Sequence, residues 1–214
     1  MNRISTSMPR IGSIALIGLL FAASVLHAQV DMGVLGGLNL DRFRVTRDPI
    51  FDIPPTKTGP GFHFALFVGL PISEIISIRG EVQQNRRAFR FEGAPNNLDW
   101  NYDYLDFPLL VSFKLRTKVQ FDLGPSLAVN HNWLRKRDGN TWHGKDQLFA
   151  VGGVRYSLTD KWEIMGRYWY GVTPLDEFQF NNGPGPNNLI SQPKIFHQTL
   201  QFSMGYKLLP RRQT

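Results

Sequence analysis

The sequence contains no cysteine, and this absence limits how the folded chain can be held together. Small exported domains often depend on disulfide bonds, which this chain cannot form. A lipoprotein anchor is excluded as well, because no cysteine follows the apolar run near the N-terminus. Non-covalent burial or embedding in a membrane must therefore stabilise the fold.

Long apolar runs and metal-binding patterns are also missing. Beyond the N-terminal segment, no stretch approaches the roughly 18 consecutive apolar residues expected of a transmembrane helix. The five histidines share no spacing typical of a metal site, so we expect no metal and no other cofactor. Nothing resembles a nucleic-acid-binding module, and no nucleic-acid partner is expected.

The N-terminal segment differs from the rest of the chain. A basic start with Arg3 and Arg10 precedes an apolar run, and Ala28 offers a small residue at a cleavage point. This pattern predicts a secretory signal peptide over residues 1–28 and one mature domain over residues 29–214. Removing the segment lowers the formal net charge from +7 to +5, so the mature chain is modestly basic.

Apolar and polar residues alternate through much of the mature chain. From Leu105 to Leu115 every odd-numbered residue is apolar, and after a short turn the alternation continues from Val119 to Asn130. A period of two indicates a strand with one apolar face. Strands of about 11 residues exceed the five or six usual in soluble domains and suit a tilted crossing of a bilayer.

Six further alternating segments bring the expected number of strands to eight. These segments cover residues 30–40, 62–70, 76–83, 148–158, 162–171 and 197–208. The links between successive strands alternate between long and short, as they do when an antiparallel barrel sorts its links between two rims. The sequence predicts an all-β fold, an eight-stranded antiparallel up-and-down transmembrane β-barrel of the outer membrane with short periplasmic turns and long extracellular loops.

Two details of the wall can also be predicted. Pro108 and Pro125 lie inside strands, where each removes a backbone donor, so we expect local bulges there. Aromatic residues near the strand ends predict an interfacial girdle. Its expected members are Trp100, Tyr102, Tyr104, Trp133, Tyr168 and Tyr170 at the outer ends and Trp162 and Tyr206 at the inner ends.

The polar faces of the strands carry charges of both signs. An eight-stranded barrel leaves room for side chains and little else, and an unpaired charge in such an interior is costly. We therefore expect the inward charges to pair as a plug, with a selective conduction path as the alternative. The predicted lumen charge network comprises Arg79, Glu81, Asp106, Lys114, Asp122, Arg155, Glu163, Arg167 and Lys207.

The long links are rich in basic residues, which are predicted to lie at the outer rim. These are Arg42, Arg44, Arg47, Arg86, Arg87, Arg90, Arg135, Lys136 and Arg137. Because arginine suits phosphate geometry, they are candidates for contact with lipopolysaccharide or an acidic protein partner, with Arg135, Lys136 and Arg137 as the densest cluster. The alternative is a solvated loop whose charges serve solubility.

Four short motifs resemble the PorT-like outer membrane β-barrel family, a group with an outer membrane protein beta-barrel domain. They are Tyr-Leu-Asp-Phe-Pro-Leu-Leu at 104–110, Gly-Pro-Ser-Leu-Ala at 124–128, Gly-Gly-Leu-Asn-Leu at 36–40 and Met-Gly-Tyr-Lys-Leu at 204–208. The resemblance implies an eight-stranded barrel and no catalytic residues. Some members are linked to a secretion apparatus and many have no known role, so the resemblance makes an accessory role in a transport or secretion assembly one candidate function.

Two other functions stay open on the sequence. Some small barrels are lipid-modifying hydrolases that use serine and histidine, yet the scattered histidines here show no neighbouring serine with an acid to orient them. The histidines considered are His63, His131, His143 and His197. A soluble exported lipocalin-like barrel is the third possibility. We expect a non-enzymatic outer membrane protein with a structural or interaction role, surrounded by outer membrane lipids.

Overall fold

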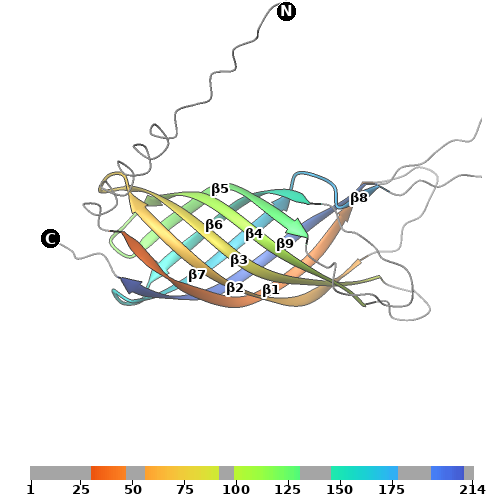
Figure 1. Cartoon of the computed structure of the whole chain (residues 1–214), viewed down its shortest axis with the longest axis horizontal. Coiled ribbons are helices and arrows are strands. Elements are labelled where there is room, and N and C mark those ends of the chain that lie inside the picture. The colour runs from red at the N-terminus through yellow and green to blue at the C-terminus, as the bar shows by residue number, and fades with distance from the viewer. Residues whose placement is uncertain (1–29, 47–55, 92–98, 131–145, 178–193, 210–214) are drawn as a thin grey trace, which may run out of the picture.

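The computed structural model describes residues 30–46, 56–91, 99–130, 146–177 and 194–209, which form one sheet (Figure 1). Its strands are β1 (Asp31–Val45), β2 (Thr56–Pro71), β3 (Ile76–Phe91), β4 (Asp99–Lys114), β5 (Val119–Asn130), β6 (Gln147–Ser157), β7 (Trp162–Gly171), β8 (Asp176–Glu177) and β9 (Lys194–Leu209). Among the described residues there is no helix that could cross a membrane.

The sheet closes into a barrel. Strands β1 to β7 pair antiparallel in chain order, and β9 pairs with both β7 and β1. The two-residue β8 pairs with β9 beyond the end of β7, so it adds no wall of its own. Eight long strands therefore enclose the lumen, which confirms the predicted eight-stranded antiparallel barrel.

The two rims differ, as the link lengths predicted. The turns from β2 to β3, β4 to β5 and β6 to β7 are short and lie at the end of the barrel where β1 begins and β9 ends (Figure 1). Backbone hydrogen bonds close each turn, for example from Ile72 N to the Ile76 carbonyl at 2.9 Å. This rim is periplasmic, and the long links leave from the opposite, extracellular rim.

Several strands extend further toward the extracellular rim than the alternation predicted. β1 includes Arg42 and Arg44, and β3 includes Arg86, Arg87 and Arg90, so their assignment to loops was wrong. The ladders continue through these residues, with Arg42 opposite Gln198 and Arg87 opposite Tyr102. The backbone hydrogen bonds of a ladder do not depend on apolar side chains, and the alternation fades where a wall rises above the apolar band.

The apolar residues face outward and most of the polar ones face inward. Leu38 is 66% exposed and Phe64 56% exposed, whereas Asn39, Gln83 and Gln201 on the inner face are each 0% exposed. A soluble protein of this size would bury its large aliphatic side chains. An outward apolar band around a polar interior is the arrangement of a barrel that stands in a bilayer.

Neither proline produces the expected bulge. The β3–β4 ladder is interrupted between Asp106 and Leu109, a stretch that contains Pro108, and the β4–β5 ladder is interrupted between Leu123 and Ser126, a stretch that contains Pro125. Both ladders resume in the same register, so each missing donor is accommodated by a gap in one ladder rather than by an extra residue. The aromatic girdle also needs correction, because Tyr102 and Tyr104 are buried inside the barrel.

Candidate functional site in the barrel lumen

The periplasmic half of the lumen is filled by ion pairs. Arg167 donates two hydrogen bonds to Glu81, from Nη1 to Oε2 at 2.7 Å and from Nη2 to Oε1 at 2.8 Å. Arg79 donates from Nε to Glu81 Oε1 at 2.6 Å and from Nη1 to Glu163 Oε1 at 2.7 Å. All four side chains are almost fully buried. These charges lose their hydration and depend on one another.

These pairs join opposite walls of the barrel. Arg79 and Glu81 lie on β3, whereas Glu163 and Arg167 lie on β7. In the closed order of eight long strands, β3 and β7 stand four places apart in either direction. The Arg167–Glu81 and Arg79–Glu163 pairs therefore cross the full width of the lumen, whereas Arg79 and Glu81 pair within β3.

A second group of charged side chains lies beside these lumen-crossing pairs. Arg155 donates from Nη2 to Asp122 Oδ1 at 2.9 Å and to Ser112 Oγ at 2.9 Å, and Arg167 Nη2 lies 3.4 Å from Asp122 Oδ2. Lys207 is less tightly held, with Nζ 3.8 Å from carboxylate oxygens of both Asp31 and Glu163. The lower lumen is thus one connected network of both signs.

Polar side chains, most of them neutral, form the next layer toward the extracellular rim. Ring nitrogens of His63 lie 2.7 Å from Ser203 Oγ and 2.8 Å from Asn39 Oδ1. Asn39 Nδ2 donates to Asn85 Oδ1, and Asn85 Nδ2 donates to Asp106 Oδ2 at 2.8 Å. A chain of hydrogen bonds therefore runs from β9 and β2 through β1 and β3 to β4.

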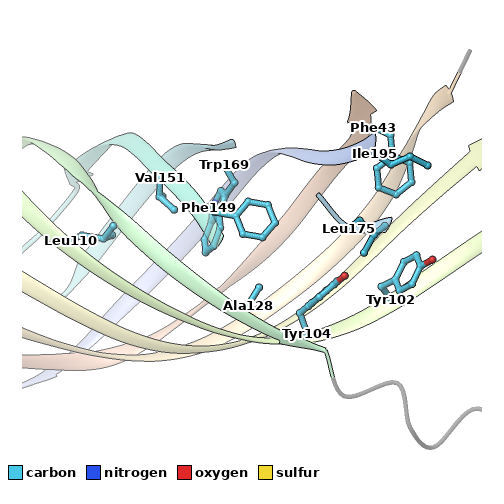
Figure 2. Close-up of a cluster of buried hydrophobic side chains, with 10 residues drawn as sticks. All are labelled: Phe43, Tyr102, Tyr104, Leu110, Ala128, Phe149, Val151, Trp169, Leu175 and Ile195. Atoms are coloured by element: carbon cyan, nitrogen blue, oxygen red, sulfur yellow. The ribbon is translucent and has the colours of Figure 1, made fainter. Parts of the chain in front are cut away.

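Aromatic and aliphatic side chains extend from Leu110, which lies opposite Arg79 in the β3–β4 ladder, toward the extracellular end of the lumen. Figure 2 shows ten of them, Phe43, Tyr102, Tyr104, Leu110, Ala128, Phe149, Val151, Trp169, Leu175 and Ile195, which are all buried. Arg87 reaches into this cluster, with its guanidinium carbon 4.4 Å from the ring centre of Phe149 and 4.8 Å from that of Tyr104. Its Nη2 also donates to Asp106 Oδ2 at 2.8 Å. Rings and aliphatic chains therefore fill the lumen above the ion pairs, together with buried polar side chains such as His197, which stacks on Phe43 and Phe149.

Below the ion pairs, the lumen opens into a cavity of about 720 Å³ at the periplasmic mouth. Ser77 on β3 and Gln120 on β5 line its wall, and the turns with Ser73 and Asp160 form its rim. Arg79 and Arg155 of the ion-pair network also line it. Solvent can therefore enter from the periplasmic side only as far as the charged layer.

The sequence matches the family of the outer membrane protein beta-barrel domain over residues 13–207. The chain belongs to this family. Its fold is similar to the crystal structure of Neisserial surface protein A, with a TM-score of 0.52, 16% identity, and coverage of 83% of this chain and 97% of that one. It is also similar to the outer membrane protein OprG from Pseudomonas aeruginosa, with a TM-score of 0.50, 15% identity, and coverage of 85% and 97%.

At these identities the solved structures establish the fold alone. No curated protein matches the sequence. Family membership and fold together identify an integral β-barrel of the outer membrane. The soluble lipocalin-like alternative is thereby overturned.

In this outer membrane barrel, most of the charged residues predicted to face the lumen do so. Arg79, Glu81, Asp122, Arg155, Glu163, Arg167 and Lys207 lie in one network, and Asp106 lies in the layer above with Arg87 and Asn85. Lys114 does not join them. It is exposed at the periplasmic mouth and forms no ion pair with any described residue.

Several lumen residues escaped the sequence reasoning. Arg87 was assigned to a loop, although continuing the alternation of Arg79, Glu81, Gln83 and Asn85 by one more step would have turned it inward. His63 and Ser203 are 140 positions apart, and no spacing in the sequence pointed to their contact. The predicted outer-rim residues Arg135, Lys136 and Arg137 lie outside the described residues.

The contact between His63 and Ser203 resembles the order of groups in a serine hydrolase. One ring nitrogen faces a serine hydroxyl and the other faces Asn39, where hydrolases place an orienting residue. Ser203 is only 7% exposed, however, and His63 and Asn39 are 3% and 0% exposed. No residue of this group lines the periplasmic cavity, so an ester bond has no described route to the hydroxyl.

Proposed function

We propose that this protein is a non-conducting, non-enzymatic outer membrane barrel that acts through its surface, as an accessory of a transport or secretion assembly. The observation that carries this proposal is the pair of ionic contacts, Arg167 to Glu81 and Arg79 to Glu163, that cross the lumen. Charges held in this way leave no continuous water path, because their hydrogen-bonding groups face one another rather than solvent.

Bilayer recording tests the closed lumen directly. The purified barrel is inserted in a planar lipid bilayer, and current is compared with that of a porin inserted in the same bilayer. Single-channel steps should be absent for this protein at moderate voltage and present for the porin. A large, steady conductance that is reproducible between preparations would overturn the proposal.

We further propose that recognition uses the extracellular side. The periplasmic turns near Ser73, Arg116 and Asp160 are short, so they offer little specific surface. Long loops in compact domains are commonly functional, and the basic cluster Arg135, Lys136 and Arg137 suits lipopolysaccharide phosphates or an acidic protein. Since exposed charges are screened, such binding should weaken as salt rises.

Replacing Arg135, Lys136 and Arg137 together by serine tests the loop cluster. Binding of lipopolysaccharide or of a cross-linked partner at low salt should fall, while heat-modifiable migration on a gel stays as in the wild type. The matched control replaces Arg116, Lys118 and Lys161 at the periplasmic turns by serine, which removes the same charge. Unchanged binding in the loop variant would contradict the proposal and favour the alternative that these charges serve solubility alone.

The resemblance to PorT-like proteins supports the accessory role, and cross-linking in cells tests it. Components of a secretion or transport assembly should co-purify with the barrel after mild cross-linking, and recovery of barrel alone would count against this role. We also propose that residues 1–28 are a cleaved signal peptide. Mass spectrometry of the membrane-inserted protein should then find Gln29 at its N-terminus, and an intact Met1 would contradict the cleavage.

A further inference from the structure

The outward surface of β1 changes from apolar to basic within two residues. Leu38 and Leu40 face the bilayer and are 66% and 43% exposed. The next outward residue, Arg42, is exposed, and Arg44 follows it. Their neighbour Asp41 is only 1% exposed and points into the lumen, so the alternation of the strand is unbroken.

The neighbouring strand β9 makes the same change at the paired positions. In the β1–β9 ladder, Leu40 lies opposite Leu200 and Arg42 lies opposite Gln198. Leu200 is 40% exposed, and the residue below it on the same face, Phe202, is 52% exposed. Because residues opposite each other in an antiparallel ladder are direct neighbours, the change from apolar to polar on β1 adjoins the change on β9, between these two pairs.

Arg44 lies against aromatic rings at this edge. Its guanidinium carbon lies 4.4 Å from the ring centre of Phe196 on β9 and 5.1 Å from that of Tyr170 on β7. Stacking of this kind holds the planar group in a fixed orientation. Its Nε is buried and has no hydrogen-bond partner.

Arg42 and Arg44 stand without a carboxylate partner in the part of the chain that the structure describes. Two positive charges thus stand directly above a surface that acyl chains cover, at the height where a membrane lipid carries its headgroup. Residues two apart on a strand are separated by about 7 Å, so one headgroup can reach both.

We propose that Arg42 and Arg44 form a binding site for the phosphate groups of an outer-leaflet lipid whose acyl chains lie along Leu38, Leu40 and Leu200. The planar guanidinium of Arg44 can donate two parallel hydrogen bonds to phosphate oxygens, and Arg42 supplies a second positive charge. This proposal rests on the proposed contact with lipopolysaccharide, but it places that contact on the wall of the barrel rather than on the loops. The lipid, rather than free phosphate, is indicated because the apolar band continues directly below the arginines.

Lipid A carries such phosphates and serves as the probe. The detergent-folded barrel is titrated with lipid A, with chemically dephosphorylated lipid A and with inorganic phosphate, and bound lipid is measured by native mass spectrometry. The wild type should bind lipid A in a saturable manner and the dephosphorylated form more weakly. Arg42→Gln/Arg44→Gln should bind lipid A about tenfold more weakly or worse, which corresponds to the loss of one charge-assisted contact or more.

The control variant is Lys118→Gln/Lys161→Gln, which removes the same charge from exposed positions at the periplasmic end. It should bind lipid A as the wild type does, which separates a site from a general effect of net charge. Arg44→Lys keeps the charge but loses the planar stacked group, so its affinity should fall between those of the wild type and the double variant. Heat-modifiable migration verifies that each variant is folded.

Three results would overturn the proposal. They are equal affinity of the double variant and the wild type for lipid A, equal affinity of the wild type for both lipid forms, and displacement of lipid A by inorganic phosphate at similar concentration. None of them bears on the closed lumen or on the accessory role, which bilayer recording and cross-linking test separately. A folded double variant that still shows no conductance but loses lipid A is the expected outcome.

Discussion

Arg167 on β7 donates hydrogen bonds from Nη1 and Nη2 to the carboxylate of Glu81 on β3, and the two strands form opposite walls of the barrel. The contact therefore ties together parts of the wall that share no backbone ladder. Both side chains are 0% exposed, so each depends on the other for the interactions that water would supply. Paired arginine and carboxylate groups in this geometry are among the stronger polar contacts in proteins.

Breaking this contact should weaken the barrel. Arg167→Met leaves Glu81 with Arg79 alone and Asp122 with Arg155 alone, and the free energy of unfolding should fall by about 3–5 kcal/mol. Urea unfolding in lipid vesicles, followed by tryptophan fluorescence, measures the change. Lys114→Met is the control, because Lys114 is exposed and lacks an ion pair among the described residues, and it should leave the urea midpoint unchanged. Equal midpoints for both variants would show that the lumen network contributes little.

Because the sequence has no cysteine, single introduced cysteines can show how deep into the lumen a reagent penetrates. Ser77 lines the periplasmic cavity, whereas Ser126 is 1% exposed above the charged layer. In Ser77→Cys, a membrane-impermeant maleimide added from the periplasmic side should react readily. In Ser126→Cys it should not react until the barrel is unfolded. Rapid labelling of folded Ser126→Cys would mean that reagent passes the ion pairs and that the lumen is open.

Period-two alternation was enough to predict the wall of this barrel, because the membrane imposes an apolar outer face on every strand. The same alternation correctly predicted that the side chains of Glu81, Asp122 and Arg167 point into the lumen. It failed at the extracellular ends, where strands rise above the apolar band and the outer face becomes polar, as at Arg42 and Arg86. There only the backbone ladder reveals the strand.

Contacts between strands that do not pair with each other could not be predicted from the sequence, for a different reason. Alternation states which way a side chain points but not its height relative to residues on distant strands, which depends on the register of every ladder between them. The approach of His63 to Ser203 depends on the pairing of β2 with β1 and of β1 with β9. Lys114 likewise lies at the end of its strand, at the mouth rather than among the carboxylates.

The close approach of β1 and β9 at Gly37 should make this position sensitive to substitution. A Cβ at Gly37 would overlap the backbone carbonyl oxygen of Phe202 on β9, whereas a Cβ at Gly80 would meet nothing within 4 Å. Gly37→Ala should lower the free energy of unfolding by about 1–3 kcal/mol, as overpacking commonly does. Gly80→Ala, the same chemical change on the outward face of β3, should be close to neutral. Urea midpoints compare the two, and a neutral Gly37→Ala would show that β1 and β9 can separate without loss.

The contact between His63 and Ser203 offers a direct test against the hydrolase alternative. Because Ser203 is buried in the polar layer above the ion pairs, a fluorophosphonate probe that labels reactive serines should not label the folded barrel, although it labels a known serine hydrolase in the same detergent. Ser203→Ala should instead affect stability, since it leaves a buried ring nitrogen of His63 without its partner, at a cost of about 1–3 kcal/mol. If the wild type were labelled and folded Ser203→Ala were not, Ser203 would be a nucleophile with access to substrate, and the protein would be an enzyme.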